Sequence, residues 1–256
     1  MATEAVGSNC AAIPMSGKQA LPVLAQGERW VVIAKPSGMV LHPSHYAGQF
    51  RDTVVQVAAA QFGRPVHAVH RLDAATSGTL LLAFDAETVA ALARQFLERK
   101  VEKRYLAVVR GWPAPEAGRI EHALEDEKGR RQEATSHYRV LALAEFPWPT
   151  QRFPQARYAL VEVRPEHGRR HQIRRHLKHL SHPLIGDSRY GKGEHNRLFR
   201  MHLSSHRLLL HAAGLVFDAP EGPRQRVDCP LTTDLVRVLS RPEWVPLVPA
   251  HWLPQP

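Results

Sequence analysis

The stretch HAVHRLDAATSGTLLLA, from His67 to Ala83, decides how this chain folds. Apolar, β-branched segments over 66–72 and 79–84 predict two strands, and the polar loop RLDAATSG lies between them. This loop carries Arg71 and Asp73 two positions apart. Catalytic side chains often lie on loops that a rigid scaffold holds, so these two residues are the first candidates for a functional site. From the residues alone, a purely structural Arg–Asp pair in the loop remains an open alternative.

The segments on either side of this stretch predict an α+β protein. Apolar and alternating patterns predict further strands over 30–34, 103–109, 134–144, 156–164 and 208–216. Helical spacing predicts helices over 53–62, from an N-cap at Asp85 to about Arg99, over 168–180 and around 234–240. The strands outnumber the helices and do not alternate regularly with them. We therefore expect a mixed, mainly antiparallel central sheet with flanking helices.

Two segments lack such periodicity. Residues 1–24 mix small and polar residues, which predicts a poorly ordered leader, with folding starting near Glu28 and one domain over 25–256. Residues 113–133 are rich in Gly, Pro and charge and are expected to form an insertion or a hairpin.

The charge of the chain favours a polyanionic partner. Its 256 residues include 34 Lys and Arg against 24 Asp and Glu, a formal net charge of +10. Cations that neutralise phosphates release counterions, so such a surface suits nucleic acid. The most basic segment is RRHQIRRHLKHL, where helical spacing places Ile173, Leu177 and Leu180 on one face. Charge alone does not separate an RNA-binding protein from an ordinary basic one.

Other patterns disfavour several classes of protein. Cys10 and Cys229 lie far apart and no Cys-x-x-Cys occurs, which argues against a disulfide framework and a thiolate zinc site. No apolar run approaches the roughly 18 residues that a membrane span needs, and the N-terminus does not resemble a signal peptide. We expect a reduced, cytoplasmic protein without a membrane segment.

A histidine cluster raises the alternative of a metal site. Its members are His171, His176, His179 and His182, and imidazole is a common zinc ligand. However, no HExxH pattern occurs, and five neighbouring Lys and Arg would repel a divalent cation. We therefore predict no metal.

The loop HRLDAATSG resembles the signature of the RluA-type pseudouridine synthases. Four further stretches resemble the same family in the same order: KPSG at 35–38, KRYLAVVRG at 103–111, GRRHQIRRHLKHLSHPLIGDSRYG at 168–191 and LLLHAAGL at 208–215. Enzymes of this family detach a uracil from its ribose and reattach it through carbon, without a cofactor. The resemblance implies their α+β fold, with a central active-site cleft, and RNA as the partner.

The resemblance also implies roles for five residues. Asp73 is the catalytic carboxylate, acting as nucleophile or base, and Arg174 pairs with it and offsets the cost of burying its charge. Tyr105 stacks on the target base, with a general-base role at C5 open. Leu210 supplies the apolar wall below Asp73. Arg71 fills the space that a flipped uridine leaves in the RNA, although pairing with a neighbouring acid remains the alternative.

The sequence also suggests a substrate. Within the family the chain resembles the branch that modifies tRNA, at uridine 65 in the acceptor/T-stem region, because it begins at the catalytic domain without an S4 RNA-binding domain. The candidates for phosphate contact are Lys128, Arg130, Arg131, Arg169, Arg170 and Arg175. A ribosomal RNA pseudouridine synthase of the same family and a non-catalytic RNA-binding protein are the alternatives. We expect a monomer.

Overall fold

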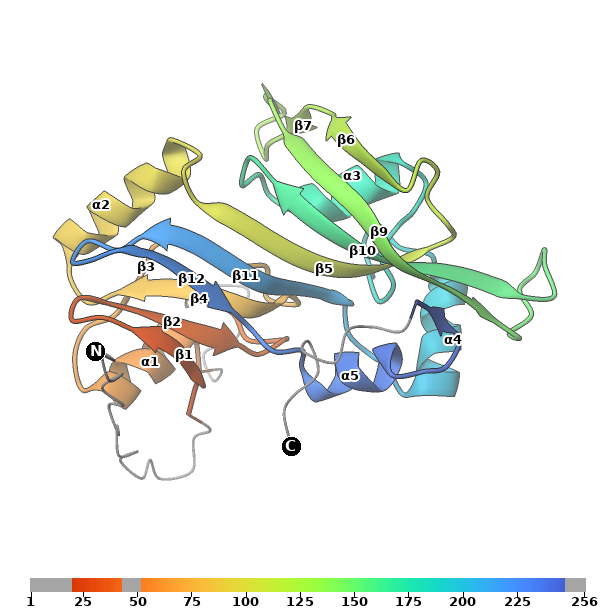
Figure 1. The fold of residues 1–256 in the computed structure, drawn as a ribbon, viewed down its shortest axis with the longest axis horizontal. Coiled ribbons are helices and arrows are strands. Elements are labelled where there is room, and N and C mark those ends of the chain that lie inside the picture. The colour runs from red at the N-terminus through yellow and green to blue at the C-terminus, as the bar shows by residue number, and fades with distance from the viewer. Residues whose placement is uncertain (1–19, 43–51, 247–256) are drawn as a thin grey trace, which may run out of the picture.

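One large sheet forms the centre of the computed structural model, which describes residues 20–42 and 52–246 (Figure 1). The main path of the sheet is β1 (Val23–Gln26), β2 (Trp30–Lys35), β4 (Ser77–Ala83), β11 (Leu210–Asp218), β5 (Glu102–Arg110), β10 (Ala156–Pro165), β9 (Thr135–Phe146) and β13 (Trp244–Val245). Three strands join its sides: β3 (His67–Ala68), β6 (Ala117–Glu121) and β12 (Arg224–Asp228). Among these described strands only β4 and β11 pair in parallel. The predicted mixed, mainly antiparallel sheet is confirmed.

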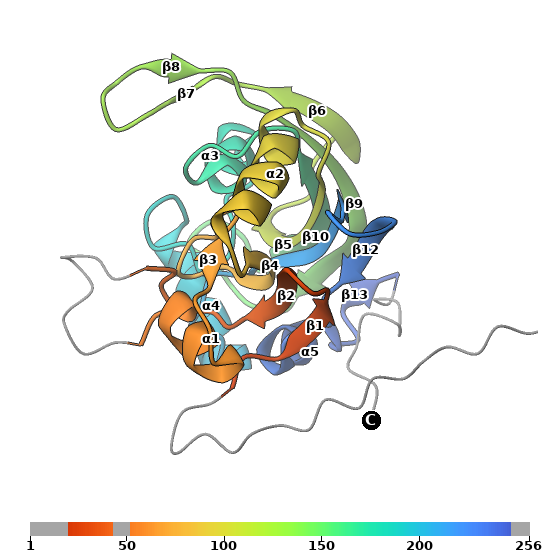
Figure 2. The ribbon, with the colours of Figure 1, turned by 90° about the vertical axis from the view of Figure 1, so that its left-hand side faces the viewer.

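Helices cover both faces of this sheet. They are α1 (Val54–Phe62), α2 (Ala86–Leu97), α3 (Gln172–His179), α4 (Gly193–Leu203) and α5 (Thr233–Leu239). A separate small hairpin, β7 (Leu124–Glu125) and β8 (Arg131–Gln132), extends away from the sheet beside α3 (Figure 2). The hairpin predicted as one possibility for residues 113–133 is therefore present. Within the described ranges, no helix has the length and apolar character to cross a membrane.

Alternating side chains along the strands explain where the helices lie. On β2, Val31 and Ile33 pack into the same cluster as α1, whereas Trp30 and Val32 pack with Leu92 of α2 on the other face. The same alternation on β5 directs one set of residues towards α3 and the other towards α4 and α5. Because every central strand is covered on both faces, its apolar residues form near-continuous runs.

The two predicted helix starts in the N-terminal half are confirmed by their caps. Thr53 and Gln56 form a reciprocal capping box at the start of α1, and Gly63 ends that helix with a left-handed φ of 64°. Asp85 caps α2 by accepting a hydrogen bond of 2.8 Å from the N–H of Thr88. The helix ends at Leu97, close to the predicted boundary.

Three predicted boundaries were wrong. The ordered fold begins before Glu28, because β1 pairs with β2 and Leu21 is buried, so only residues 1–19 of the expected leader lie outside the described residues. The predicted strand over 66–72 is reduced to β3, since the chain turns away from β4 to enter the loop. Helix α3 begins at Gln172 rather than 168, after a turn in which His171 has a φ of 54°.

Several elements were not predicted at all. Helix α4 follows the GDSRYG loop and buries Leu198, Phe199 and Leu203 on one face, but its sequence is mostly polar and begins with Gly. Strands β12 and β13 are short and gain their stability from pairing with β11 and β9. Their existence depends on partners that are distant in the sequence.

The parallel contact between β4 and β11 requires a glycine. Gly78 has a φ of 116°, and a Cβ at this position would lie 2.1 Å from the carbonyl oxygen of Ala212. We expect Gly78→Ala to lower the free energy of unfolding by more than about 3 kcal/mol, because it adds a backbone clash to conformational strain. Gly63→Ala, which has a positive φ but open space around it, is the control and should cost about 1–2 kcal/mol. Urea unfolding measures both, and equal losses would contradict the close approach.

Candidate active site

The loop that carries Asp73 is held in place by the turn after β2. The Lys35 ammonium, almost completely buried, donates hydrogen bonds of 2.9 Å to the carbonyl oxygens of Ala74 and Thr76. The N–H of Gly38 donates to the carbonyl of Ala74 at 2.8 Å. The KPSG segment therefore holds the backbone of the loop that carries Asp73.

Lys35 occupies an unusual electrostatic position. Its pKa is lowered to about 7, chiefly because burial disfavours the charged amine and also because Arg207 lies nearby. The negative charge of Asp73 acts in the opposite direction. The charge state of Lys35, which supports the loop, therefore depends in part on the nearby charge of Asp73.

Arg174 joins two carboxylates that come from different parts of the chain. Its Nη1 donates to Oδ2 of Asp73 at 3.0 Å. Its Nε and Nη2 donate to the two oxygens of Asp187 at 2.7 and 2.9 Å, a bidentate pair. The predicted pairing of Arg174 with Asp73 is present, and Arg174 is buried rather than solvated on the helix surface. Within the described part of the chain, the side chains at ion-pair distance from Asp73 are Arg174 and His171 rather than Arg71.

Asp187 anchors Arg174 from behind. Its side chain is fully buried, and one of its oxygens also accepts hydrogen bonds from the N–H groups of Arg189 and Tyr190. Burial alone would raise the pKa of Asp187, but the Arg174 guanidinium and these N–H groups outweigh burial and lower it. The pKa of Arg174 is raised in the same way, because the two carboxylates outweigh its own burial. The guanidinium stays charged and fixed in orientation.

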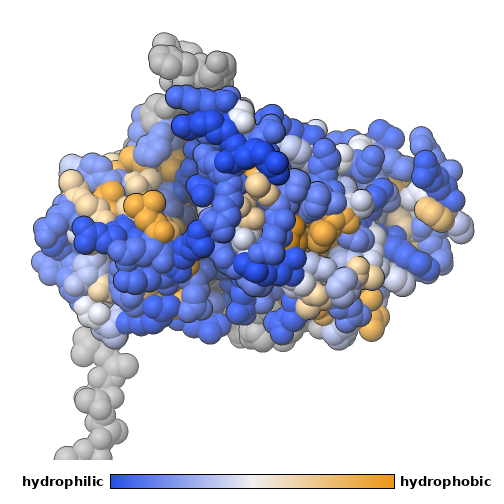
Figure 3. Space-filling model, turned by 90° about the horizontal axis from the view of Figure 1, so that it is seen from above, coloured by the Kyte–Doolittle hydropathy of each residue, from blue (hydrophilic) through white to orange (hydrophobic). Residues whose placement is uncertain are grey.

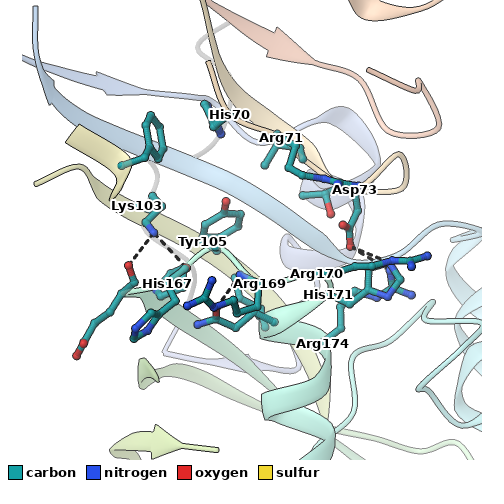
Figure 4. Close-up of a pocket in the computed structure, with 18 of the residues that line it drawn as sticks. His70, Arg71, Asp73, Lys103, Tyr105, His167, Arg169, Arg170, His171 and Arg174 are labelled. Atoms are coloured by element: carbon teal, nitrogen blue, oxygen red, sulfur yellow. Dashed lines mark hydrogen bonds and ion pairs between the residues drawn. The ribbon is translucent and has the colours of Figure 1, made fainter. Parts of the chain in front are cut away.

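Asp73 and Arg174 line a cavity of about 510 Å³ (Figure 4). Its wall includes Asp73 and Arg71 from the loop, Tyr105 from β5, Arg174 from α3 and Leu210 at the start of β11. All five residues to which the sequence assigned a role in the site thus meet at one cavity, from four separate segments. Asp73 is partly accessible there, with 21% of its side chain exposed. A cavity of this size falls in the usual range for small ligands.

Two residues of β5 face this cavity. Burial, together with the charge of Asp73, raises the pKa of Tyr105 above its usual range, so the phenol stays protonated at neutral pH. Lys103 lies two residues earlier on the same side of the strand and donates to the carbonyls of Glu166 and His167 at 3.2 Å each. Burial lowers the pKa of Lys103 to about 8.

His171 completes the surroundings of Asp73. Its Nε2 lies 3.8 Å from Oδ2 of Asp73, and its Nδ1 lies 3.1 Å from the hydroxyl of Tyr190. Burial lowers the pKa of His171, although the charge of Asp73 opposes this shift. A neutral imidazole beside the carboxylate leaves Arg174 as the charge that is in direct contact with Asp73.

Arg71 is exposed at the rim of the cavity. Within the described part of the chain its side chain has no ion pair, so the alternative of pairing with a neighbouring acid is not supported. Its guanidinium is therefore available to a ligand that enters the cavity.

The six candidates for phosphate contact fall into two groups. Arg169 and Arg170 line the cavity, whereas Arg175, Lys128, Arg130 and Arg131 do not. The β7–β8 hairpin nevertheless touches α3, because Arg175 donates to the carbonyl of Glu125 and Arg170 pairs with Glu127. The exposed Arg130 is paired with Asp126 of its own hairpin. Seen from above, the surface that contains these elements is mainly hydrophilic, with small hydrophobic patches (Figure 3).

The histidines of the α3 region have other partners than a metal. His176 contacts the hydroxyl of Ser136 and the carbonyl of His122, His179 stacks on the ring of His122, and His182 contacts the carbonyl of Arg110. Across residues 20–42 and 52–246, no cluster of three or more His, Cys, Asp or Glu has the arrangement of a metal site.

Comparison with known proteins assigns the chain that carries this site to a family. Residues 29–179 match the family model described as RNA pseudouridylate synthase. This chain belongs to the RNA pseudouridylate synthase family. Like other members, it is therefore an isomerase that acts on RNA.

Curated relatives in this family are similar over most of the chain. The tRNA pseudouridine synthase C of Vibrio parahaemolyticus is 42% identical over 211 residues, which cover 78% of this chain and 85% of that protein. The protein of the same name from Salmonella typhi is 37% identical over 241 residues, covering 90% of this chain and 92% of that protein. The expected resemblance to the RluA-type enzymes is confirmed.

Solved structures of pseudouridylate synthase domains have a similar fold. Human RNA Pseudouridylate Synthase Domain Containing 4 superposes with a TM-score of 0.69 and 28% identity, covering 87% of this chain and 93% of that one. Human RNA Pseudouridylate Synthase Domain Containing 1 has a TM-score of 0.67 at 23% identity, covering 87% and 89%.

Sequence reasoning missed the supporting residues of the site. Lys35 and Asp187 lie in the quoted stretches KPSG and LIGDSRYG, but no role was assigned to either. The signal that could have found them is their residue type: a Lys directly after a buried strand and an Asp in a loop near a basic helix both need a partner if they are buried. Which partner each one has could not be read from spacing.

We expect Lys35→Met to change the pH dependence of stability. The pKa of Lys35 is about 7 in the folded protein and 10.5 for a free side chain, so the unfolded state binds more protons between these values. The free energy of unfolding of the wild-type protein should therefore rise with pH in this window through Lys35, and the variant should lack this part of the rise. Urea unfolding between pH 7 and 10 measures the difference. The exposed Lys128→Met is the control, and parallel curves for wild type and Lys35→Met would contradict the shift.

Proposed function

We propose that this protein isomerises uridine to pseudouridine in tRNA, at uridine 65 in the acceptor/T-stem region, with Asp73 as the catalytic carboxylate. The observation that carries the proposal is the shared guanidinium of Arg174, which places a partly accessible Asp73 beside Tyr105 and Leu210 in one cavity. The tRNA substrate is supported by relatives that are named tRNA pseudouridine synthase C.

The chemistry of the isomerisation explains why one carboxylate is enough. The bond between ribose C1′ and uracil N1 breaks, the uracil turns, and C5 bonds to C1′ while its proton is lost and N1 gains one. The atoms of substrate and product are the same, so no group or electron has to come from elsewhere. Asp73 acts on this path by attack at C1′, by addition at C6 or by removal of the C2′ proton, and each role needs an ionised carboxylate. Arg174 donates a hydrogen bond of 3.0 Å to this carboxylate and places a positive charge beside it.

The other residues of the cavity suit a flipped nucleotide. Tyr105 offers an aromatic ring on which a pyrimidine stacks, an interaction worth about 1–3 kcal/mol. Because its phenol stays protonated, stacking and hydrogen-bond donation suit Tyr105 better than proton abstraction in the free enzyme. Arg71, exposed and unpaired at the rim, occupies the space that the flipped uridine leaves. Leu210 forms the apolar part of the wall.

The basic surface around the cavity supports recognition of a folded RNA. Arg169 and Arg170 at the cavity, with Arg175 and the cations of the β7–β8 hairpin, would contact phosphates on either side of the target. A target inside a stem is recognised through backbone and shape more than through sequence. We further propose that the protein acts as a monomer in the cytoplasm.

Asp73→Asn is expected to abolish activity and to leave RNA binding almost unchanged. The amide keeps the shape of the side chain but removes its charge and its basicity, so the rate of pseudouridine formation should fall by at least about 10³-fold. Affinity for unmodified tRNA should change less than about threefold. Release of tritium from [5-³H]uridine-labelled tRNA measures the rate, and Asp218→Asn, an exposed carboxylate outside the cavity, is the control. A variant at position 73 with the wild-type rate would favour the non-catalytic RNA-binding alternative.

The position of the product tests the substrate. Carbodiimide-blocked reverse transcription of RNA from cells with and without the protein should give one stop that depends on the protein, at uridine 65 of tRNA. A stop in ribosomal RNA and none in tRNA would replace the substrate while leaving the chemistry of Asp73 intact. Re-expression of the Asp73→Asn variant should not restore the stop.

A further inference from the structure

A second groove lies beyond the C-terminal end of α3. It has a volume of about 1000 Å³ and is formed by the loop between β9 and β10, the start of α4 and the Ser181–His182 turn. None of its lining residues is shared with the catalytic cavity. Helix α3 has Arg174 near its start and Ser181 just past its end, so about 10 Å of helix separates the two sites.

The groove is strongly basic. Its wall contains five cations, Arg110, Arg152, Arg157, Lys192 and Arg197, and two carboxylates, Glu145 and Glu194. Glu145 is paired with Arg157, and Glu194 accepts a hydrogen bond from the N–H of Gln151. Both carboxylates are thus already engaged with the protein.

Three of these cations are free to bind an anion. Arg152, Lys192 and Arg197 are exposed, and their side chains make no ion pair or hydrogen bond with any other described residue. Three uncompensated charges around one hollow produce a field that attracts phosphates. The fold itself has no evident need for them.

An aromatic ring stands beside these charges. Phe153, at the tip of the β9–β10 loop, is 65% exposed although it is apolar. Its position is fixed, because the N–H of Phe153 donates to Oγ1 of Thr150 at 3.0 Å and the N–H of Thr150 donates to the carbonyl of Phe153 at 2.8 Å. The hydrogen bond from Gln151 to Glu194 ties the same loop to α4. A hydrogen-bonded turn therefore presents the ring to solvent.

We propose that this groove binds an unpaired stretch of the RNA substrate while the target uridine occupies the catalytic cavity. A basic groove with an exposed aromatic ring is the arrangement that binds single-stranded RNA, because the cations follow the phosphates and the ring stacks on a base. In a duplex the base faces are stacked on one another and Phe153 would have no surface to meet. The inference rests on the proposed RNA substrate and adds a second point of attachment to it.

The test measures RNA binding, whereas the proposed function is tested by pseudouridine formation. A negative result for the groove can therefore be distinguished from a negative result for the proposed function. Two sets of stem–loop RNA with the acceptor/T-arm sequence are compared, one blunt and one with four unpaired nucleotides at the 3′ or the 5′ end. Fluorescence anisotropy gives the affinity of each for the wild-type protein, for Phe153→Ala and for Arg152→Gln/Arg197→Gln. Arg237→Gln, an exposed arginine on α5 outside both sites, is the control for loss of charge.

The wild-type protein should bind one of the two extended RNAs about 10-fold more tightly than the blunt RNA. Phe153→Ala should remove most of this difference, and Phe153→Trp should restore it. The double variant should also lower the dependence of log K on log salt by about 1.4 for the extended RNA, because two contacts to a single strand are lost. Arg237→Gln should retain the 10-fold preference.

Two results would overturn the proposal. Equal weakening of blunt and extended RNA by the variants would assign the groove to the backbone of a duplex. Unchanged affinities in every variant would show that the groove does not contact this RNA. Because Phe153, Arg152 and Arg197 are exposed, thermal melting of the variants should match that of the wild type, which excludes loss of folding as the cause.

Discussion

The arrangement of the site depends on one buried guanidinium that is shared between two carboxylates. Arg174 makes two hydrogen bonds to Asp187, which is fully buried, and a third to Asp73, which is partly accessible. Removal of one partner from such a buried pair typically costs about 3–5 kcal/mol, because the other charge is left without compensation. The buried Asp187 therefore fixes the position of the Arg174 guanidinium. The guanidinium in turn orients the carboxylate of Asp73.

A second constraint acts on the backbone around Asp73. Lys35 holds the carbonyls of the loop by hydrogen bonds, and it does so from within the core, where a charge is costly. The parallel contact of β4 with β11, which requires Gly78, brings the loop against Leu210. The polar residues of the cavity are thus supported by packing that belongs to the fold itself.

We propose different roles for the two hollows of the surface, the cavity beside Asp73 and the groove beyond α3. The cavity beside Asp73 brings together a carboxylate, the aromatic ring of Tyr105 and the apolar side chain of Leu210, which suit the proposed isomerisation of one base. The groove beyond α3 has free cations and an exposed ring but no carboxylate that is available for chemistry. Because α3 connects the two, an RNA that reaches both would be held in one register relative to Asp73.

The sequence by itself determined the class of fold, the extent of α1, the N-cap of α2, and the five residues that meet at the cavity. These follow from local patterns: alternation on strands, a side chain that caps its own helix, and short motifs that resemble a family. Only the tertiary structure decided that Asp187 shares Arg174, that Lys35 supports the loop, and that α4 and the β9–β10 loop enclose a second groove. Those contacts join segments that are far apart in the chain, and their partners are set by strand register and packing, which no local pattern specifies.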